Sequence, residues 1–444
     1  MQKITGHWRK IPYLAVSSLI FCGGFFLLIF RLNHECVWND EAFTWAILYR
    51  HHFSDTWQFI INDVHPPLYY LMLKLFGLAF GNSMTAIRFF SVLGGLALAA
   101  LGLGPVRRAC GRKAGLLYSC MVFITPAILA MSQEGRMYSW AAFFVTGTSL
   151  YAYLAVTDNK PMDWVRLGLF TLGAAYIHYY ALTAVVITHF LLLVWLIIKN
   201  RQGLIPFLIV AGGVLLCYLP WLPVFIMQLG RVKQDYWISP VSAKMIWDTF
   251  CFPFGDKFSC APELFIFRSY AAGLAWVLIL WDLWRTARAR KRENKNVNHS
   301  PGLFAISIYL FTILGVIFFS YLVRPVFGPR YTIVITSLFI LSAAIGLSLI
   351  PKKSVFWGAS ILYLLFGISG LVPIFKQHFN GPIGKAVSYL KSNVSAGAVF
   401  VHFNYNWQTM NTFCYYFPKY RHFIYIPGKS KNEIYSIFLI NRVY

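Results

Sequence analysis

The chain has 444 residues, of which 58% are hydrophobic and only 12% are charged, so its composition excludes a soluble or a disordered protein. Its 39 basic and 15 acidic residues give a formal net charge of +24, a value that also occurs in nucleic-acid-binding proteins. The distribution of the basic residues indicates a membrane protein instead, and we expect no nucleic-acid partner.

Apolar runs that meet or approach the length of a transmembrane helix recur along the chain. They lie at 13–30, 86–106, 114–131, 138–156, 164–177, 181–198, 204–226, 267–284, 303–323, 331–350 and 354–374. Because a spanning helix needs about 20 apolar residues, the sequence predicts an all-α, multi-pass membrane protein with about eleven transmembrane helices. No small-residue cleavage site follows the first run, so we expect a retained helix and not a signal peptide.

The short basic loops orient these helices. With Lys3, Arg9 and Lys10 in the cytoplasm, alternating passes place the basic clusters at 107–113, 199–201, 285–295 and 352–353 on the same side, as the positive-inside rule requires. The segments 31–85 and 227–263 and the tail from about 375 then face the outside.

Two adjacent carboxylates, Asp40 and Glu41, follow the first apolar run in the sequence W-N-D-E-A-F. Acidic residues are scarce in this chain, so a pair at a membrane exit is conspicuous. Paired carboxylates suit proton abstraction or cation binding, and a membrane exit suits a substrate held in lipid. The alternative is two solvated loop acids.

Residues 66–80 are apolar but short and carry Lys74 in their middle. A full span here would invert every later helix and place the basic loops outside. We therefore predict an interfacial or re-entrant helix on the outer face, with a short true span as the alternative.

Further polar residues collect at the predicted outer ends of the helices. They are His65, Arg88, Glu134, Arg136, Tyr138, His178, Tyr179 and Arg330. Cations placed outside against the topological bias need an anionic partner, and a phosphate in the headgroup layer would serve. Snorkelling of a long side chain could explain Arg88 alone, but not the whole group at one face.

The tail from 375 to 444 is predicted to be a small extracytoplasmic αβ module that follows a transmembrane domain at 1–374. We expect helices near 381–392 and 405–417 and strands near 398–401 and 423–426. Cys251 and Cys260 share one outer loop, where a disulfide and two free thiols are both compatible with the sequence. We find no internal repeat, no glycine-rich phosphate loop and no Cys/His spacing typical of zinc sites.

The order of the motifs resembles that of the GT-C membrane glycosyltransferases. The motifs are W-N-D-E-A-F-T, D-V-H-P-P-L-Y-Y, A-I-R-F-F-S, S-Q-E-G-R-M-Y-S, Y-I-H-Y-Y and L-P-W-L-P-V, followed later by G-P-R-Y-T-I. The bacterial branch related to protein O-mannosyltransferases, the aminoarabinose transferase of lipid A and the RgtA/B/C/D-like transferases is the most similar group. The resemblance covers about 35–225 well.

This resemblance implies an enzyme of the plasma (inner) membrane that moves a sugar from a polyprenyl-phosphate donor to a hydroxyl of a lipid, glycan or protein acceptor on the outer face. Asp40 matches the proposed catalytic base of the family, with Glu41 beside it, and Glu134 matches its second acidic position. His65 matches the basic residue before the paired prolines, where related enzymes often carry Lys. Some relatives bind a divalent metal ion between such acids, so Asp40 and Glu134 are the metal candidates, and no other cofactor is implied.

The transfer of a sugar from a polyprenyl phosphate needs a base and several cations, and the candidate residues include both. Displacing a polyprenyl phosphate passes through an oxocarbenium-like state, and the weakly basic phosphate leaves without a general acid. One carboxylate, Asp40, is enough to accept the proton of the hydroxyl, while Glu41 and Glu134 orient it or hold a cation. The phosphate candidates are His65, Arg88, Arg136 and Arg330, with Tyr138, His178 and Tyr179 lining the cavity.

Two other functions share part of this pattern. A transporter or flippase of lipid-linked sugars would have the same topology, but it should show charged residues near the middle of the bilayer and paired broken helices, which the sequence lacks. A polysaccharide polymerase or ligase is chemically closer, but its polar site is expected in a large late loop and not directly after the first span.

Overall fold

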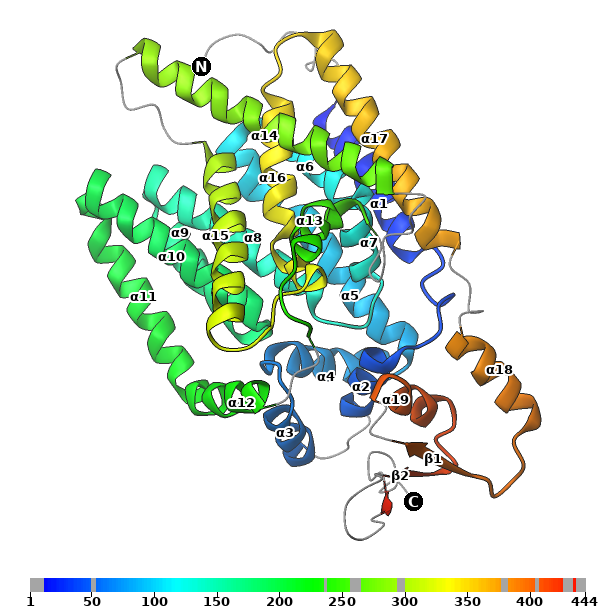
Figure 1. Cartoon of the computed structure of the whole chain (residues 1–444). Coiled ribbons are helices and arrows are strands. Elements are labelled where there is room, and N and C mark those ends of the chain that lie inside the picture. The colour runs from blue at the N-terminus through cyan, green and yellow to red at the C-terminus, as the bar shows by residue number, and fades with distance from the viewer. Residues whose placement is uncertain are drawn as a thin grey trace.

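The computed structural model is predominantly helical (Figure 1) and describes residues 12–48, 53–234, 238–255, 265–293, 300–376, 382–403, 407–425 and 434–436. The helices of the first half are α1 (Tyr13–Ile29), α2 (Asn39–Leu48), α3 (Phe53–Asn62), α4 (Leu68–Phe80), α5 (Met84–Ala100), η1 (Gly102–Val106), α6 (Arg107–Ile124), α7 (Pro126–Ser132), α8 (Tyr138–Thr157), α9 (Pro161–Ile177), α10 (Tyr179–Lys199), η2 (Arg201–Gly203) and α11 (Leu204–Tyr218). Those of the second half are η3 (Leu219–Trp221), α12 (Leu222–Gln234), α13 (Ala243–Cys251), η4 (Phe252–Phe254), α14 (Phe265–Glu293), α15 (Pro301–Leu322), η6 (Pro329–Thr332), α16 (Ile333–Ser348), α17 (Lys353–Lys376), α18 (Pro382–Asn393) and α19 (Trp407–Tyr416).

Each of the predicted apolar runs coincides with helix in the structure. Among the described residues, seven helical segments are long and apolar enough to cross a membrane by length and composition. One of these segments, Met84–Ile124, contains two antiparallel helices and not one. Ser119 Oγ of α6 donates to the carbonyl oxygen of Ala99 in α5 at 2.8 Å, and a Cβ on Gly115 would lie 2.2 Å from the carbonyl oxygen of Gly102. The multi-pass helical architecture is therefore confirmed, while the count of eleven spans stays a prediction.

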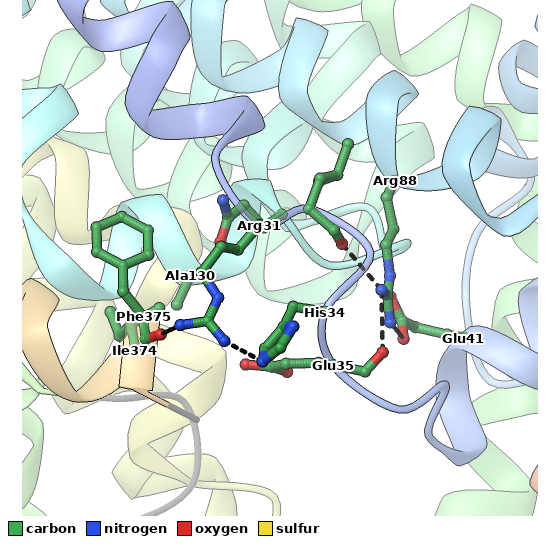
Figure 2. A pocket seen from close by; sticks show the side chains of 10 residues that line it. Arg31, His34, Glu35, Glu41, Arg88, Ala130, Ile374 and Phe375 are labelled. Carbon is green, nitrogen blue, oxygen red and sulfur yellow. Dashed lines mark hydrogen bonds and ion pairs between the residues drawn. The ribbon is translucent and has the colours of Figure 1, made fainter. Parts of the chain in front are cut away.

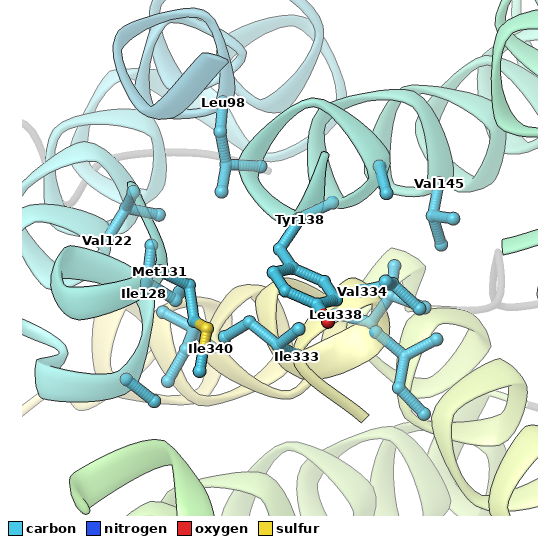
Figure 3. Packing of buried hydrophobic residues seen from close by; sticks show 14 of the residues in the cluster. Leu98, Val122, Ile128, Met131, Tyr138, Val145, Ile333, Val334, Leu338 and Ile340 are labelled. Carbon is cyan, nitrogen blue, oxygen red and sulfur yellow. The ribbon is translucent and has the colours of Figure 1, made fainter. Parts of the chain in front are cut away.

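Helix α16 forms the centre of the bundle. Every residue from Ile333 to Leu347 is buried, and the helix packs against α6, α8, α14 and α15. Figure 3 shows Tyr138 of α8 among aliphatic side chains that include Ile333, Val334 and Leu338 of α16. A helix that is apolar on nearly all sides lies either in a protein core or in lipid, and the burial of α16 places it in the core.

The outer helices present apolar side chains to their surroundings. In α11, Leu208, Leu215 and Leu216 are 59%, 67% and 69% exposed. So large an apolar surface is not stable in water and requires lipid around the bundle.

Helices α2, α3, α4 and α12 gather at one end of the bundle, together with α19 and the sheet, whereas the loop between α16 and α17 lies at the opposite end (Figure 1). Helix α4 has 13 residues. It therefore covers about 20 Å, which is short for a hydrocarbon layer of about 30 Å. Its Tyr69, Tyr70 and Leu73 are buried, while Leu75 and Leu78 are exposed. This length disfavours a full span, and the interfacial position of α4 stays a prediction.

The tail contains the expected helices and strands. Strands β1 (Val399–Phe403), β2 (Arg421–Tyr425) and β3 (Ile434–Ser436) form a small sheet in that order, with β1 parallel and β3 antiparallel to β2. Helix α19 packs directly on α2. Both alternatives for Cys251 and Cys260, a disulfide or two free thiols, stay predictions, because Cys260 lies outside the described residues.

The contacts between α19 and the segment around α2 are specific. Asn411 Nδ2 donates to Asn39 Oδ1 at 2.9 Å, the amide of Val37 donates to the Tyr416 hydroxyl at 2.9 Å, and the rings of Trp45 and Tyr415 meet edge to face. The tail therefore forms part of the surroundings of the acidic helix, and whether it is a separate module stays open to test.

The predicted orientation can be tested with single cysteines at exposed positions. A cysteine at Lys352, between α16 and α17, should resist a membrane-impermeant thiol reagent in spheroplasts, whereas a cysteine at Asp55 in α3 should react above the wild-type background. Both positions should react after the membrane is opened with detergent. Labelling at Lys352 in sealed spheroplasts would contradict the orientation.

Candidate active site

A buried ion pair anchors the acidic end of α2. Asp40 and Glu41 occupy the first turn of this helix, where negative charge interacts favourably with the helix dipole. The Glu41 carboxylate accepts two hydrogen bonds from Arg88 of α5, from Nε at 2.8 Å and from Nη2 at 2.6 Å. Glu41 is 1% exposed and Arg88 is 3% exposed. A buried charge of this kind persists only when it is paired and hydrogen-bonded, and both conditions hold here.

The same pair ties two loops to the helices. Arg88 Nη1 donates to the carbonyl oxygens of Leu32 at 2.9 Å and Glu35 at 3.2 Å (Figure 2), and the amide of Gly135 donates to Glu41 Oε1 at 2.9 Å. Four of the five N–H donors of Arg88 are thus used within the protein. The two side chains line a pocket together with Arg31, His34, Glu35, Gln133 and residues of α17, and of the predicted site residues only these two reach it.

Arg330 joins the other two predicted acids. Its Nη2 lies 2.5 Å from Glu134 Oε1 and 3.8 Å from Asp40 Oδ2. Its guanidinium carbon stands 4.2 Å from the ring centre of Trp38 and 5.3 Å from that of Tyr138, close enough for cation–π attraction to both. The side chain of Glu134 is fully buried, whereas that of Asp40 is 33% exposed.

The position of Arg330 bears on the metal prediction for Asp40 and Glu134. A guanidinium nitrogen within 4 Å of both carboxylates already supplies the positive charge that a bridging cation would bring. In this arrangement the two acids do not fit a divalent ion, because the ion would have to displace Arg330. We therefore derive no step through a metal at these residues.

Arg136 lies on the other side of Asp40 and is 3% exposed. Its Nη1 contacts only neutral oxygens, those of Thr44 at 3.2 Å and of the Asp40 carbonyl and the Tyr70 hydroxyl at 3.4 Å each. Its Nη2 is 3.5 Å from His65 Nε2, and its Nε has no hydrogen-bond partner. Within the described ranges no carboxylate comes within 4 Å of this guanidinium, so it is a buried cation held only by long, weak contacts.

His65 is oriented by Asp63, a residue that the sequence analysis did not assign to the site. Asp63 Oδ2 accepts from His65 Nδ1 at 3.0 Å and from the Tyr70 hydroxyl at 2.9 Å. Burial opposes the charge on Asp63, but His65 and Arg136 outweigh it and hold the pKa of the carboxyl below its usual value. The spacing D-x-H before the paired prolines was the available signal, since a carboxylate two residues from a histidine often orients its ring.

His178 presents a second imidazole to this group. It caps α10, and its Nδ1 accepts from the amide of Tyr180 at 3.1 Å, so its proton resides on Nε2. Burial, together with the charges of His65 and Arg136, holds the pKa of His178 well below its usual value and keeps the ring neutral. Nε2 has no partner among the described residues, and the ring lies 5.8 Å from those of His65 and Tyr138.

The structure thus brings Asp40, His65, Glu134, Arg136, Tyr138, His178 and Arg330 into one group. Tyr179 belongs to a neighbouring cluster, because its hydroxyl donates to Gln228 Oε1 of α12 and accepts from Trp221 Nε1 at 3.2 Å. Tyr70 and Trp38 were missed by the sequence analysis, since their contacts depend on how α2, α4 and the loop before α16 pack together.

Comparisons with known proteins show what the chain is similar to in sequence and in fold. Residues 64–224 match the family model described as dolichyl-phosphate-mannose-protein mannosyltransferase. ArnT from Cupriavidus metallidurans has a similar structure both in the apo state, at 12% identity and a TM-score of 0.59, and bound to undecaprenyl phosphate, at 13% identity and a TM-score of 0.58. Each of these matches covers 95% of this chain and 86% of ArnT.

The Archaeoglobus fulgidus oligosaccharyltransferase, solved in complex with Zn and sulfate, is also similar. Its identity is 12% and its TM-score is 0.56, over 88% of this chain and 60% of that chain. No curated protein matches the chain in sequence.

The resemblance predicted from the motifs is confirmed: the chain has the GT-C fold, and its residues 64–224 match a glycosyltransferase family model. The family model begins within the D-V-H-P-P motif and ends after L-P-W-L-P-V, so it includes His65, Arg88, Glu134, Arg136 and His178.

The buried pair predicts that removing one of its two charges destabilises the protein more than removing both. Glu41→Gln should lower the free energy of unfolding by about 3–5 kcal/mol, because it leaves the Arg88 charge buried without a counter-ion. Adding Arg88→Met should restore part of this loss, since the double variant buries no charge. Denaturant unfolding of the detergent-purified proteins measures both effects.

The exposed pair Lys244–Asp248, with side chains 81% and 20% exposed, provides a matched control. Asp248→Asn should change the free energy of unfolding by less than about 1 kcal/mol. Equal effects of Glu41→Gln and Asp248→Asn, or additive losses in the Glu41/Arg88 double variant, would contradict the proposed role of the buried pair.

Proposed function

We propose that this protein transfers a sugar from a polyprenyl-phosphate donor to a hydroxyl group of a lipid, glycan or protein acceptor, at the outer face of the plasma membrane. The observation that carries the proposal is Arg136, a buried guanidinium without a carboxylate partner among the described residues, next to Asp40. The similarity to ArnT, whose structure has been solved with undecaprenyl phosphate, supports a donor of this class.

Arg136 is assigned to the donor phosphate. A buried cation is costly unless an anion accompanies it, so the site is electrostatically incomplete without a negatively charged ligand. The contacts at 3.2–3.5 Å to Thr44, Tyr70 and His65 are long, and a phosphate oxygen could replace them with shorter, charge-assisted bonds. The Nε2–H of His178, which has no partner among the described residues, provides a further donor in the same group.

Asp40 is assigned as the general base. Its side chain is 33% exposed, whereas those of Glu41 and Glu134 are buried and hydrogen-bonded to Arg88 and Arg330. Of these three acids, only Asp40 can therefore reach an incoming hydroxyl without breaking a buried ion pair. Arg330, at 3.8 Å, complements its negative charge without a tight hydrogen bond.

The reaction balances with these groups alone. The acceptor oxygen forms a bond to the anomeric carbon while the bond between that carbon and the phosphate oxygen breaks. The phosphate leaves as polyprenyl phosphate, and the hydroxyl proton passes to Asp40. Arg136 stabilises the negative charge that grows on the departing phosphate.

Glu41, Arg88, Glu134 and Arg330 are assigned as positioning residues. Glu41 and Arg88 fix the first turn of α2 against α5 and the Gly135 loop, and Glu134 holds the guanidinium of Arg330 beside Asp40. Together they keep Asp40 in place relative to Arg136, which matters because small misplacements of reacting groups slow a reaction strongly.

The transfer can be tested with purified protein and radiolabelled polyprenyl-phosphate sugars. Sugar-dependent release of free polyprenyl phosphate, with the label transferred to an added cell-envelope lipid or glycan fraction, is the expected result. If no donor of this class is consumed, while the protein hydrolyses or transfers from a nucleotide sugar, the proposal is wrong.

Asp40→Asn keeps the size and polarity of the side chain but cannot accept a proton. Turnover should fall by about 100-fold or more, whereas donor binding should persist. Asp55→Asn, at an exposed acid of α3, is the matched control and should retain activity. Wild-type turnover in Asp40→Asn would remove Asp40 from the mechanism.

Arg136→Ala should weaken donor binding and slow transfer together, because the phosphate is charged in the ground state and gains charge in the transition state. Arg136→Lys should recover only part of both, since an ammonium group cannot replace the planar fork of a guanidinium. Donor dissociation constants, measured on variants with matched melting temperatures, check this result, with Arg201→Ala at the opposite end of the bundle as the control. An unchanged donor dissociation constant in Arg136→Ala would show a purely structural role.

A further inference from the structure

Three buried side chains of metal-ligating type meet in the tail, away from the acids of the active site. They are His402 in β1, Cys414 in α19 and His422 in β2, which are 8%, 3% and 4% exposed. One ligand atom from each lies within 4.8 Å of the other two. The sequence analysis found no zinc-type spacing because the cluster is assembled by the parallel pairing of β1 with β2 and by the packing of α19.

The His422 imidazole is oriented as in a metal site, and the His402 imidazole lies beside it. His422 Nε2 donates to the carbonyl oxygen of Phe417 at 3.0 Å, so its Nδ1 carries a lone pair directed at the cluster. His402 Nε2 lies 3.1 Å from that Nδ1, and the two rings are stacked at 14° with their centroids 5.4 Å apart. A backbone carbonyl that fixes the tautomer of a histidine is a common feature of metal ligation.

We propose that His402 Nε2, Cys414 Sγ and His422 Nδ1 bind one divalent transition-metal ion, with zinc the preferred one. Tetrahedral zinc with bonds of about 2.0–2.1 Å to nitrogen places two ligating nitrogens about 3.3 Å apart, close to the separation of these two imidazoles. A thiolate with two imidazoles favours zinc over magnesium or calcium, which prefer oxygen. The fourth tetrahedral position is left for water or a further ligand.

Ligation requires neutral imidazoles and a thiolate, so binding of the metal would displace the thiol proton of Cys414.

Such an ion would connect the tail to the active site, without depending on the function proposed above. It joins β1, α19 and β2, and α19 packs on α2, which carries Asp40 and Glu41. The metal would thus hold α19 in the position from which Asn411 and Tyr416 contact Asn39 and Val37. Its role is to order the tail over the acidic helix, and not to contact the substrate.

The experiment measures metal directly on the full chain, purified in detergent with a tag that contains no histidine. Wild-type protein loaded with zinc and dialysed should retain about one zinc per chain by elemental analysis. Loading with cobalt(II) instead should produce the thiolate-to-cobalt charge-transfer absorption of a tetrahedral site with one cysteine ligand. Cys36→Ser, which removes another thiol beside α19, should keep both signals, whereas Cys414→Ser should lose the charge-transfer band.

The cobalt spectrum is measured on the wild-type protein, so it tests the proposal even if a variant does not fold. Wild-type protein that retains no metal, or that binds cobalt without a thiolate band, would overturn the proposal. A full equivalent of zinc in the double variant Cys414→Ser, His422→Ala would place the metal elsewhere and would also overturn it. Retention of zinc by Asp40→Asn is expected, because that residue is not a ligand.

Discussion

The buried pair of Glu41 and Arg88 is the constraint on which the rest of the active site depends. Neither charge is stable in a dry interior alone, so each restricts the other to one geometry. Through Leu32, Glu35 and Gly135 the pair also connects the exit of α1, the start of α2 and the loop between α7 and α8. These are the segments that carry Asp40, Glu134 and Arg136, and their relative positions follow from this one interaction.

The remaining charged residues differ in whether a charge of opposite sign lies close to them. Glu134 and Arg330 satisfy each other, and Asp40 lies at the edge of their contact with part of its carboxylate exposed. Arg136 Nη1 hydrogen-bonds only to neutral oxygens, although the residue is as deeply buried as Arg88. A buried cation whose hydrogen bonds go to neutral oxygens suits an oxyanion, which is what the proposed polyprenyl-phosphate donor would supply.

The tail also restrains α2, because α19 packs directly on it. Helix α19 covers α2 through an amide pair, a tyrosine hydroxyl and an aromatic contact, so the order of the tail bears directly on the position of Asp40. The three ligand-type side chains on β1, α19 and β2 would fix that order if they bound a single ion, as proposed above. A small sheet with few buried residues gains most from such a cross-link.

The sequence by itself determined the class of protein, the positions of the long helices and most members of the polar group. These are local properties: the hydropathy of about 20 consecutive residues predicts a membrane helix, and basic loops predict the orientation of the helices in the membrane. Ordered motifs then gave the resemblance to GT-C glycosyltransferases, in which Asp40, His65 and Glu134 match family positions. Arg136, His178 and Arg330 were found as polar residues at the predicted outer ends of helices. The helices and strands of the tail also followed from their periodicity.

Only the tertiary structure decided which acidic and basic residues form ion pairs. Arg88 is 47 residues from Glu41, and Arg330 is 196 residues from Glu134. Local patterns carry no information about such pairs, because helix packing sets them. For the same reason the sequence assigned Arg88 to the phosphate, whereas its donors are used by Glu41 and two carbonyls, and it missed Asp63 and the His402–Cys414–His422 cluster. The sequence gives the residue types at each position, but a site forms only where helix packing brings those residues together.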